Sequence, residues 1–362
     1  MDRRSLLLGA GGAAVTVGAA ALGWRAAVGS MAEYAAYAAR LRRAPDPADL
    51  RDLVRYAGLA PSSHNTQPWR FRIGDGAIDI APDFARRTPA VDPDDHHLQV
   101  SLGCAAETLA IAGAAAGWPG EFGIAPDGDW PRYAFARGAA RPDPLAAAIA
   151  QRQSSRSEYD GRAAAPAELA ALEAAARVPG VALALVTERP RIAQLRDLVV
   201  AANSMQMADP AFLRELEGWI RFNPRSAMAR GDGLFAAAAG NPVAPGAVGR
   251  LAFEHLFSAA AENDKYARQV GSAAGLAVFV ADRADPPHWR AVGRACQRFA
   301  LTATSLGLKV AFVNQPVEVA ALRQDLARVI GAAGKRPDIL MRFGRGPALP
   351  LSPRRPVAET LS

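Results

Sequence analysis

The spacing of hydrophobic positions predicts both helices and strands in this chain. Apolar residues recur at helical intervals over 33–43 and again over 46–59, where Asp-Pro is typical of a helix start. Residues 69–73 and 77–80 instead alternate apolar and polar with a period of two, on either side of a Gly-Asp-Gly turn. We therefore expect two helices followed by an antiparallel hairpin.

A long run over 98–116 is apolar on nearly every side, with Glu107 as its only charge, which predicts a helix inside a core. Residues 103–117 of this run align without gaps with 293–307, from glycine to glycine. Both runs end at a glycine that suits a helix C-terminus. The repeat predicts two related units about an approximate twofold axis, and the alternative is chance similarity between two alanine-rich helices.

The hydrophobic pattern of the rest of the chain also predicts both helices and strands. Between 223 and 245 the chain is irregular and rich in glycine and proline, and it is long enough to cover a site. The other predicted helices are 145–149, 166–176, 191–205, 212–222 and 317–330, together with the repeated helix that starts at Asp285-Pro286. The other predicted strands are 181–186, 276–280, 309–313 and 338–343.

The N-terminal segment, residues 1–30, carries a targeting pattern. Arg3 and Arg4 precede a weakly apolar run rich in glycine and alanine, which resembles a twin-arginine (Tat) export signal. The segment is either cleaved or kept as a membrane anchor, and the alternative is the basic start of an ordinary buried helix. We expect no other segment to span a membrane.

A proline-containing stretch near residue 142 divides the remainder into two parts. The first half is 31–142, and the second half is 143–362, which includes the possible cover at about 223–245. With 362 residues, of which 50% are hydrophobic and 21% charged, the chain has enough apolar surface for one large core or two moderate ones.

Composition excludes several classes of function. The net charge is +7, but the arginines are scattered without a basic block or interleaved aromatic residues, so we expect no nucleic-acid binding. Cys104 and Cys296 are too far apart for a CxxC motif and too few for a disulfide framework, and we expect both in the core. His96 and His97 lack the neighbouring ligand spacing that would complete a metal site, so no metal is expected.

Polar chemistry is concentrated in three short segments. The loop 61–69 reads Pro-Ser-Ser-His-Asn-Thr-Gln-Pro-Trp, and so many hydrogen-bonding side chains before a strand favour a polar ligand site. Residues 151–157 read Gln-Arg-Gln-Ser-Ser-Arg-Ser, where guanidinium groups lie beside hydroxyls, a combination that binds phosphate. The alternative for that segment is an exposed helix end with solvated arginines. The Arg-rich tail at 352–356 is a second candidate for phosphate contact.

These motifs together resemble the FMN-dependent nitroreductase family. The likeness rests on Pro-Ser-Ser-x-Asn-x-Gln-Pro-Trp, Arg-x-Ser-x-Arg, a long helix ending in Gly-Leu and a C-terminal basic cluster, and it covers roughly 44–360. In ordinary members the arginine motif precedes the loop within one subunit of a homodimer. Here the motif follows the loop and the long helix occurs twice, which is similar to the Acg-type, internally duplicated nitroreductases.

The resemblance implies an α+β, nitroreductase-like fold of two fused pseudo-twofold-related units, with central antiparallel or mixed sheets and long core helices. It implies one FMN per chain between the units, in a monomer that mimics the family dimer. One unit would bind the phosphate and the loop of the other would approach the flavin ring and ribityl chain, while no catalytic residue is assigned because the hydride chemistry belongs to the cofactor. The residues implied for cofactor binding are Pro61, Ser62, Ser63, Asn65, Gln67, Arg152, Ser154, Arg156, Asn314, Gln315, Arg354 and Arg355.

Three functions stay open at this level. The first is an oxidoreductase that passes electrons from a reduced donor to a small nitro- or quinone-type acceptor. The second is a non-catalytic FMN-binding protein that stores or sequesters flavin in the cell envelope, and the third is an envelope protein that has lost its cofactor. Export by the Tat machinery would follow FMN loading and would place the protein in the periplasm or cell envelope, with the signal as its membrane contact.

Overall fold

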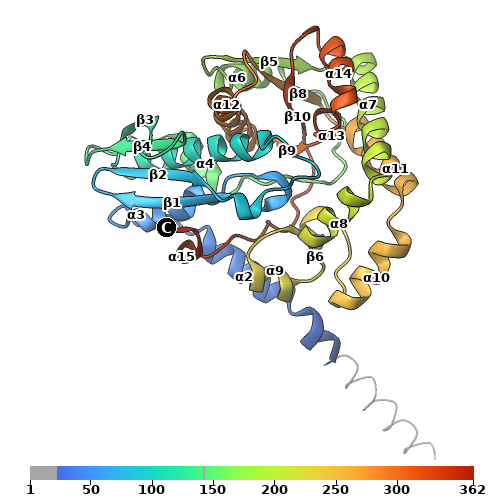
Figure 1. Cartoon of the computed structure of the whole chain (residues 1–362), viewed down its shortest axis with the longest axis horizontal. Helices are drawn as coiled ribbons and strands as arrows, with labels where there is room; N and C mark the ends of the chain where they lie inside the picture. Colours follow the sequence, from blue (N-terminus) through green and yellow to red (C-terminus); the bar gives the residue numbers. More distant parts are fainter. Residues whose placement is uncertain (1–22, 142) are drawn as a thin grey trace, which may run out of the picture.

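The computed structural model describes residues 23–362 with the exception of residue 142 (Figure 1). The twin-arginine motif and most of the predicted signal lie outside the described residues. The described part contains two four-stranded antiparallel sheets, a short parallel pair of strands and many helices, so the predicted α+β class is confirmed.

The first sheet has the strand order β1-β2-β4-β3. Strands β1 and β2 form the predicted hairpin, with Phe71 opposite Ile80. Strands β3 and β4 were not predicted, because glycines interrupt the first and most of its side chains are exposed, so that no two-residue alternation stands out. The bounds are β1 (Trp69–Gly74), β2 (Ala77–Pro82), β3 (Gly120–Ile124) and β4 (Pro131–Phe135).

The second sheet has the order β5-β8-β10-β9, and all four strands were predicted. The two central strands are buried along their whole length, which explains why they read as continuous apolar runs. The bounds are β5 (Val181–Val186), β8 (Gly275–Ala281), β9 (Lys309–Phe312) and β10 (Pro337–Gly344). The short parallel pair is β6 (Ile220–Arg221) with β7 (Leu234–Phe235).

The α-helices are α2 (Met31–Leu41), α3 (Leu50–Ala57), α4 (His96–Ala115), α5 (Pro144–Ile149), α6 (Pro166–Ala175), α7 (Arg189–Met207), α8 (Pro210–Trp219), α9 (Pro224–Arg230), α10 (Gly246–Leu256), α11 (Ala259–Gly271), α12 (Pro286–Ser305), α13 (Gln315–Glu318), α14 (Arg323–Val329) and α15 (Val357–Thr360). Helices α4 and α12 pack against each other between the two sheets, α4 on the first and α12 on the second (Figure 1). The two long helices therefore form the centre of the molecule.

Some helix boundaries differ from the predictions. Helix α3 starts after Asp49, whose carboxylate accepts a hydrogen bond from the backbone N–H of Arg51, and not at Asp46. The helix predicted over 317–330 is interrupted, because Val319 adopts an extended conformation between α13 and α14. Helix α11 was not predicted, and the irregular segment 223–245 contains α9 and β7.

Where α4 and α12 cross, each helix makes the same kind of contact with the other. A Cβ atom added to Gly103 would lie 2.0 Å from the carbonyl oxygen of Arg290, and one added to Gly293 would lie 2.0 Å from that of Val100. Gly103 and Gly293 are equivalent in the sequence repeat, and Val100 and Arg290 each lie three residues before these glycines. Each helix therefore contacts the other through the same two positions, as in an interface with twofold symmetry.

Polar contacts between these helices are reciprocal in the same way. The Glu107 carboxylate accepts a hydrogen bond from Arg298 at 2.8 Å. In the equivalent positions, the Gln297 amide donates to the Thr108 hydroxyl at 2.9 Å. These reciprocal contacts support the two fused, pseudo-twofold-related units of the predicted fold.

Helix α4 is also the one helix in the described part of the chain whose length and apolar composition would suit a membrane crossing. Of its most apolar window, 83% is buried inside the protein. Its apolar surface therefore contacts the core.

Candidate functional site

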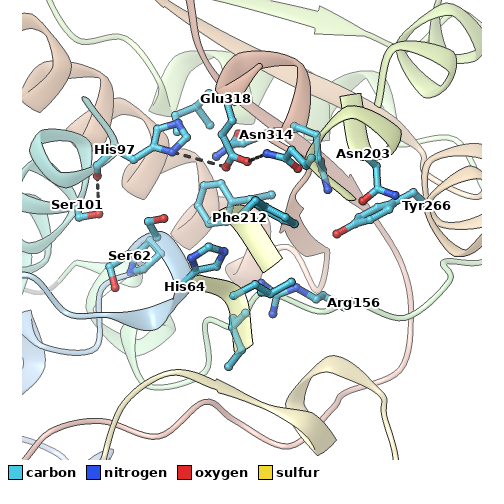
Figure 2. A pocket seen from close by; sticks show the side chains of 18 of the residues that line it. Ser62, His64, His97, Ser101, Arg156, Asn203, Phe212, Tyr266, Asn314 and Glu318 are labelled. Atoms are coloured by element: carbon cyan, nitrogen blue, oxygen red, sulfur yellow. Dashed lines mark hydrogen bonds and ion pairs between the residues drawn. The ribbon is translucent and has the colours of Figure 1, made fainter. Parts of the chain in front are cut away.

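A cavity of about 990 Å³, partly open to solvent, lies between segments from both halves of the chain (Figure 2). The first half contributes the loop 61–64 and the start of α4. The second half contributes Arg156, parts of α7, α8 and α11, and the segment that follows β9. Among the predicted site residues, those that line the cavity are Pro61, Ser62, Ser63, Arg156, Asn314 and Gln315.

The loop reaches the cavity in an unusual backbone conformation. His64, Asn65 and Gln67 have φ angles of 44°, 55° and 54°, in the left-handed region that residues other than glycine seldom occupy. Such conformations cost of order 1–3 kcal/mol each and persist where the surroundings fix them. The loop is therefore held in place by contacts elsewhere in the protein.

The C-terminal tail provides those contacts. The Asn65 side chain donates to the carbonyls of Gly233 and Pro353 and accepts from Arg354 at 2.9 Å. The Gln67 side chain donates to the carbonyl of Gly231 at 2.9 Å. It accepts from the backbone N–H of Arg355, also at 2.9 Å. Both amides are buried and their hydrogen bonds are made within the protein.

The two arginines of the tail also form hydrogen bonds within the protein. Arg354 donates to the carbonyls of Leu59 and Ala60, and Arg355 donates to those of Gln67 and Glu359. The sequence analysis expected Asn65, Gln67, Arg354 and Arg355 to contact the cofactor, and in the structure none of these four residues lines the cavity. The terminal guanidinium nitrogens of both tail arginines therefore bind backbone carbonyls, while the Nε atom of each is buried without a partner among the described atoms.

Of the residues in the Arg-x-Ser-x-Arg segment, one arginine lines the cavity, whereas the other arginine and the serine do not. Arg156 lines the cavity, and within the described ranges no carboxylate lies within ion-pair distance of its guanidinium. Arg152 is buried behind the loop and donates to the carbonyl of Leu59 at 3.0 Å, while its Nε and Nη1 have no partner among the described atoms. Ser154, which was predicted to contact the phosphate, forms an isolated β-bridge with Val310 and does not line the cavity.

Two amides follow β9 at the cavity wall. The side-chain oxygen of Asn314 accepts from the backbone N–H of Leu340 at 2.8 Å, so part of this side chain is fixed by the second sheet. The side-chain oxygen of Gln315 is buried without a partner in the part of the chain that is described. These groups offer hydrogen-bonding positions to a polar ligand.

The cavity has a histidine-containing end that the sequence prediction did not include (Figure 2). His97 Nδ1 lies 3.7 Å from Glu318 Oε1, and the other Glu318 oxygen accepts from Gln206 at 2.6 Å. Burial lowers the pKa of His97 and raises the pKa of Glu318. His64 also lines the cavity, and burial, followed by the positive charge of Arg156, lowers its pKa to about 4.

The sequence signal for this end was the pair His96-His97, which was weighed only as a metal site. Side-chain ligand atoms of Asp92, His96 and His97 do lie within 4.8 Å of one another. However, both Asp92 oxygens accept backbone N–H groups at the start of α4, and His96 Nε2 lies 3.0 Å from the Asp338 carboxylate. These contacts make the group a helix cap beside a histidine–carboxyl pair.

Part of the cavity wall is apolar and comes from the second half of the chain. Its side chains come from α7, α8, β7 and the residue after α10. They are Met207, Phe212, Leu216, Leu234 and Phe257. A flat aromatic group would find apolar contacts on this wall and hydrogen-bonding groups at both ends.

No protein-family model matches the chain. Two sequences from Mycobacterium tuberculosis, of strains CDC 1551 / Oshkosh and ATCC 25618 / H37Rv, are each 28% identical to it over 338 residues, which is 88% of this chain and 92% of the relative. Both are provisionally named NAD(P)H nitroreductases.

Two solved structures show a weaker likeness. A nitroreductase of Desulfitobacterium hafniense with bound FMN is 16% identical with a TM-score of 0.40, over 61% of this chain and 98% of that chain. A nitroreductase of Bacteroides fragilis with bound FMN is 14% identical with a TM-score of 0.36, over 57% of this chain and 90% of that chain. In sequence, the chain is thus similar over most of its length to proteins named as nitroreductases.

Proposed function

We propose that the chain is an FMN-binding, nitroreductase-like oxidoreductase whose cofactor occupies the cavity between its two halves. The observation that carries this proposal is Arg156, a cation from the second half without a carboxylate partner in the described structure, in one cavity with Ser62 and Ser63 of the first half. A guanidinium and hydroxyl groups that line one cavity can supply charge-assisted and neutral hydrogen bonds to a phosphate-bearing ligand.

The remaining lining fits the rest of FMN. The cavity is partly open to solvent and is lined by both polar and apolar side chains, as ligand sites commonly are. The Gln315 amide offers an unpartnered oxygen to a donor on the flavin ring, and the apolar wall offers a surface for the ring itself. When bound, FMN supplies the electron-transfer chemistry, while the protein binds, orients and shields it.

The architecture supports a fused pair of related units, as in the Acg-type members. The reciprocal contacts of α4 and α12 are those of a dimer interface enclosed in one chain. We propose one FMN per chain in a monomer that mimics the family dimer. The Arg3-Arg4 motif supports export by the Tat machinery to the periplasm or cell envelope.

The names of the relatives suggest a reduced nicotinamide as donor and a nitro compound as acceptor. The test begins with an FMN titration of the purified protein, followed by anaerobic mixing of the loaded protein with NADPH. Flavin bleaching that is reversed by a nitroaromatic compound supports the oxidoreductase. Bound flavin that no nicotinamide reduces supports the storage function instead, and a protein that binds no FMN contradicts the proposal.

A further inference from the structure

The histidine-containing end of the cavity holds a ring nitrogen that no contact within the described structure uses. His97, in the first turn of α4, is only 5% exposed and lines the cavity. Its Nδ1 faces Glu318 at 3.7 Å, whereas its Nε2 is buried without a hydrogen-bond partner. An unpartnered buried imidazole nitrogen costs free energy unless a ligand contacts it.

Both members of this pair are fixed in position. The backbone N–H of His97 donates to the Asp92 carboxylate at 2.9 Å, which anchors the first turn of α4. The Gln206 amide donates to Glu318 at 2.6 Å from α7. Figure 2 shows His97 and Glu318 directed toward each other at the end of the cavity away from Arg156 and His64. The pair therefore lies in the cavity, separate from the residues assigned to the phosphate.

The surroundings favour the uncharged forms of both groups. Burial is the main cause of the lowered pKa of His97, and the neighbouring His96 and Arg336 lower it further, against the carboxyl groups of Asp92 and Glu318. Burial likewise raises the pKa of Glu318. A neutral His97 whose Nδ1 faces a protonated carboxyl group carries its imidazole proton on Nε2, the atom without a partner.

We propose that His97, supported by Glu318, donates the proton that completes the two-electron reduction of a quinone-type acceptor in this cavity. This inference rests on the proposed function, since the reduced cofactor supplies the hydride. The hydride brings two electrons and one proton to the quinone and leaves an oxyanion on one of its oxygens. The Nε2 proton of His97 moves to that oxygen while the Glu318 proton moves to Nδ1, so the pair loses one proton and the hydroquinone leaves neutral. A proton from solvent then returns to Nε2 and the Nδ1 proton returns to Glu318, which restores the starting state.

The test compares two oxidants of the FMN-loaded, dithionite-reduced protein in stopped flow. Menadione needs protons for its two-electron reduction, and ferricyanide takes single electrons without protons. We expect His97→Gln and Glu318→Gln to slow reoxidation by menadione by about 100-fold, because general acids contribute roughly 10²–10⁴-fold, and to leave the ferricyanide rate within about twofold. His255→Gln and Glu254→Gln make the same substitutions at exposed positions of α10 and should change neither rate.

A menadione rate that is unchanged in FMN-loaded His97→Gln would overturn the inference and leave the proposed function standing. Absence of FMN binding in the unmodified protein would overturn both. A measurement on the unmodified, FMN-free protein guards against misfolded variants: long-range ¹H–¹⁵N NMR of its five histidines. We expect His97 to be neutral with its proton on Nε2 between about pH 6 and 8, and an imidazolium or a proton on Nδ1 would contradict the proposed donor.

Discussion

In the loop 61–69, the side-chain amides of two residues stabilise the protein, although the sequence analysis expected them to bind a ligand. Asn65 and Gln67 have positive φ angles, and their amides are fully engaged with the tail and the segment around Gly231. Their polarity in the sequence did not show which side chains of the loop would line a cavity and which would be used inside the protein. In the structure Pro61, Ser62 and Ser63 line the cavity, and the two amides make buried hydrogen bonds.

Replacing Asn65 with alanine should therefore destabilise the protein. The change removes three hydrogen bonds, leaves the guanidinium of Arg354 short of an acceptor, and places alanine at a φ of 55°. Leaving such buried groups unpaired costs about 1–3 kcal/mol in the free energy of unfolding, measured by urea denaturation. Asn241→Ala, at an exposed position, is the control. Equal stabilities of the two variants would show that the amide does not hold the loop.

His96 and Asp338 form a buried pair that shares one proton. Burial lowers the pKa of His96 to about 3 and raises that of Asp338 to about 6. Between about pH 4 and 6 the folded pair thus carries its proton on the carboxyl group, whereas in the unfolded chain the proton is on the histidine. The number of bound protons is the same in both states, so this pair adds little pH dependence to stability.

His64 lacks such a compensating partner. Its pKa of about 4 in the folded protein lies below the value near 6.5 of an unfolded chain, so the folded state binds fewer protons between these values. Stability is therefore lost as the pH falls from about 6.5 towards 4. We expect His64→Asn, which tolerates the positive φ, to reduce the slope of unfolding free energy against pH by about 1.4 kcal/mol per unit. Urea denaturation at pH 5.0–6.5 measures this slope, and parallel curves would mean that His64 titrates normally.

At the scale of elements, the crossing of α4 and α12 depends on two glycines. Their repeat positions were visible in the sequence, and so were the glycines that end the helices, Gly117 and Gly307, which have φ angles of 83° and 73°. The close approach at Gly103 and Gly293 was not predictable, because the sequence gives the small side chain but not the partner backbone. Strands β3 and β4 were missed for a similar reason, since β4 joins the first sheet by pairing with β2, and β3 joins it by pairing with β4.

Gly103→Ala and Gly293→Ala should each destabilise the protein, because the new methyl group would lie 2.0 Å from a backbone oxygen of the other helix. Overpacking of this kind costs typically about 1–3 kcal/mol in the free energy of unfolding. The double variant should cost less than the sum of the two, since one shift of the helices relieves both clashes.

Gly271→Ala is the matched control, because nothing lies within 4 Å of its added Cβ atom. This change should leave stability equal or slightly higher, as alanine favours helix. Urea denaturation of the four variants decides the matter. Crossing variants as stable as the control would place the helices further apart than described.

At the scale of the whole molecule, each half supplies one sheet and one long helix, and the cavity needs both halves. The loop and the arginine segment stood out in the sequence because their side chains suit a polar ligand that carries a phosphate. The path of the C-terminal tail could not be recognised in the sequence. Because of this path, Arg354 and Arg355 bind backbone carbonyls of the loop region. The apolar wall and the His97–Glu318 pair come from elements far apart in the sequence, so no local motif marked them.

The central claim is that FMN binds across the two halves with its phosphate at Arg156. The most direct test is the dissociation constant of FMN for Arg156→Ala, measured by quenching of flavin fluorescence, beside Arg283→Ala as an exposed arginine control. Loss of a charge-assisted contact worth about 1.5–3 kcal/mol predicts roughly 10- to 150-fold weaker binding in Arg156→Ala, with one FMN per chain in the unmodified protein. An affinity equal to that of Arg283→Ala would contradict the placement of the cofactor in this cavity.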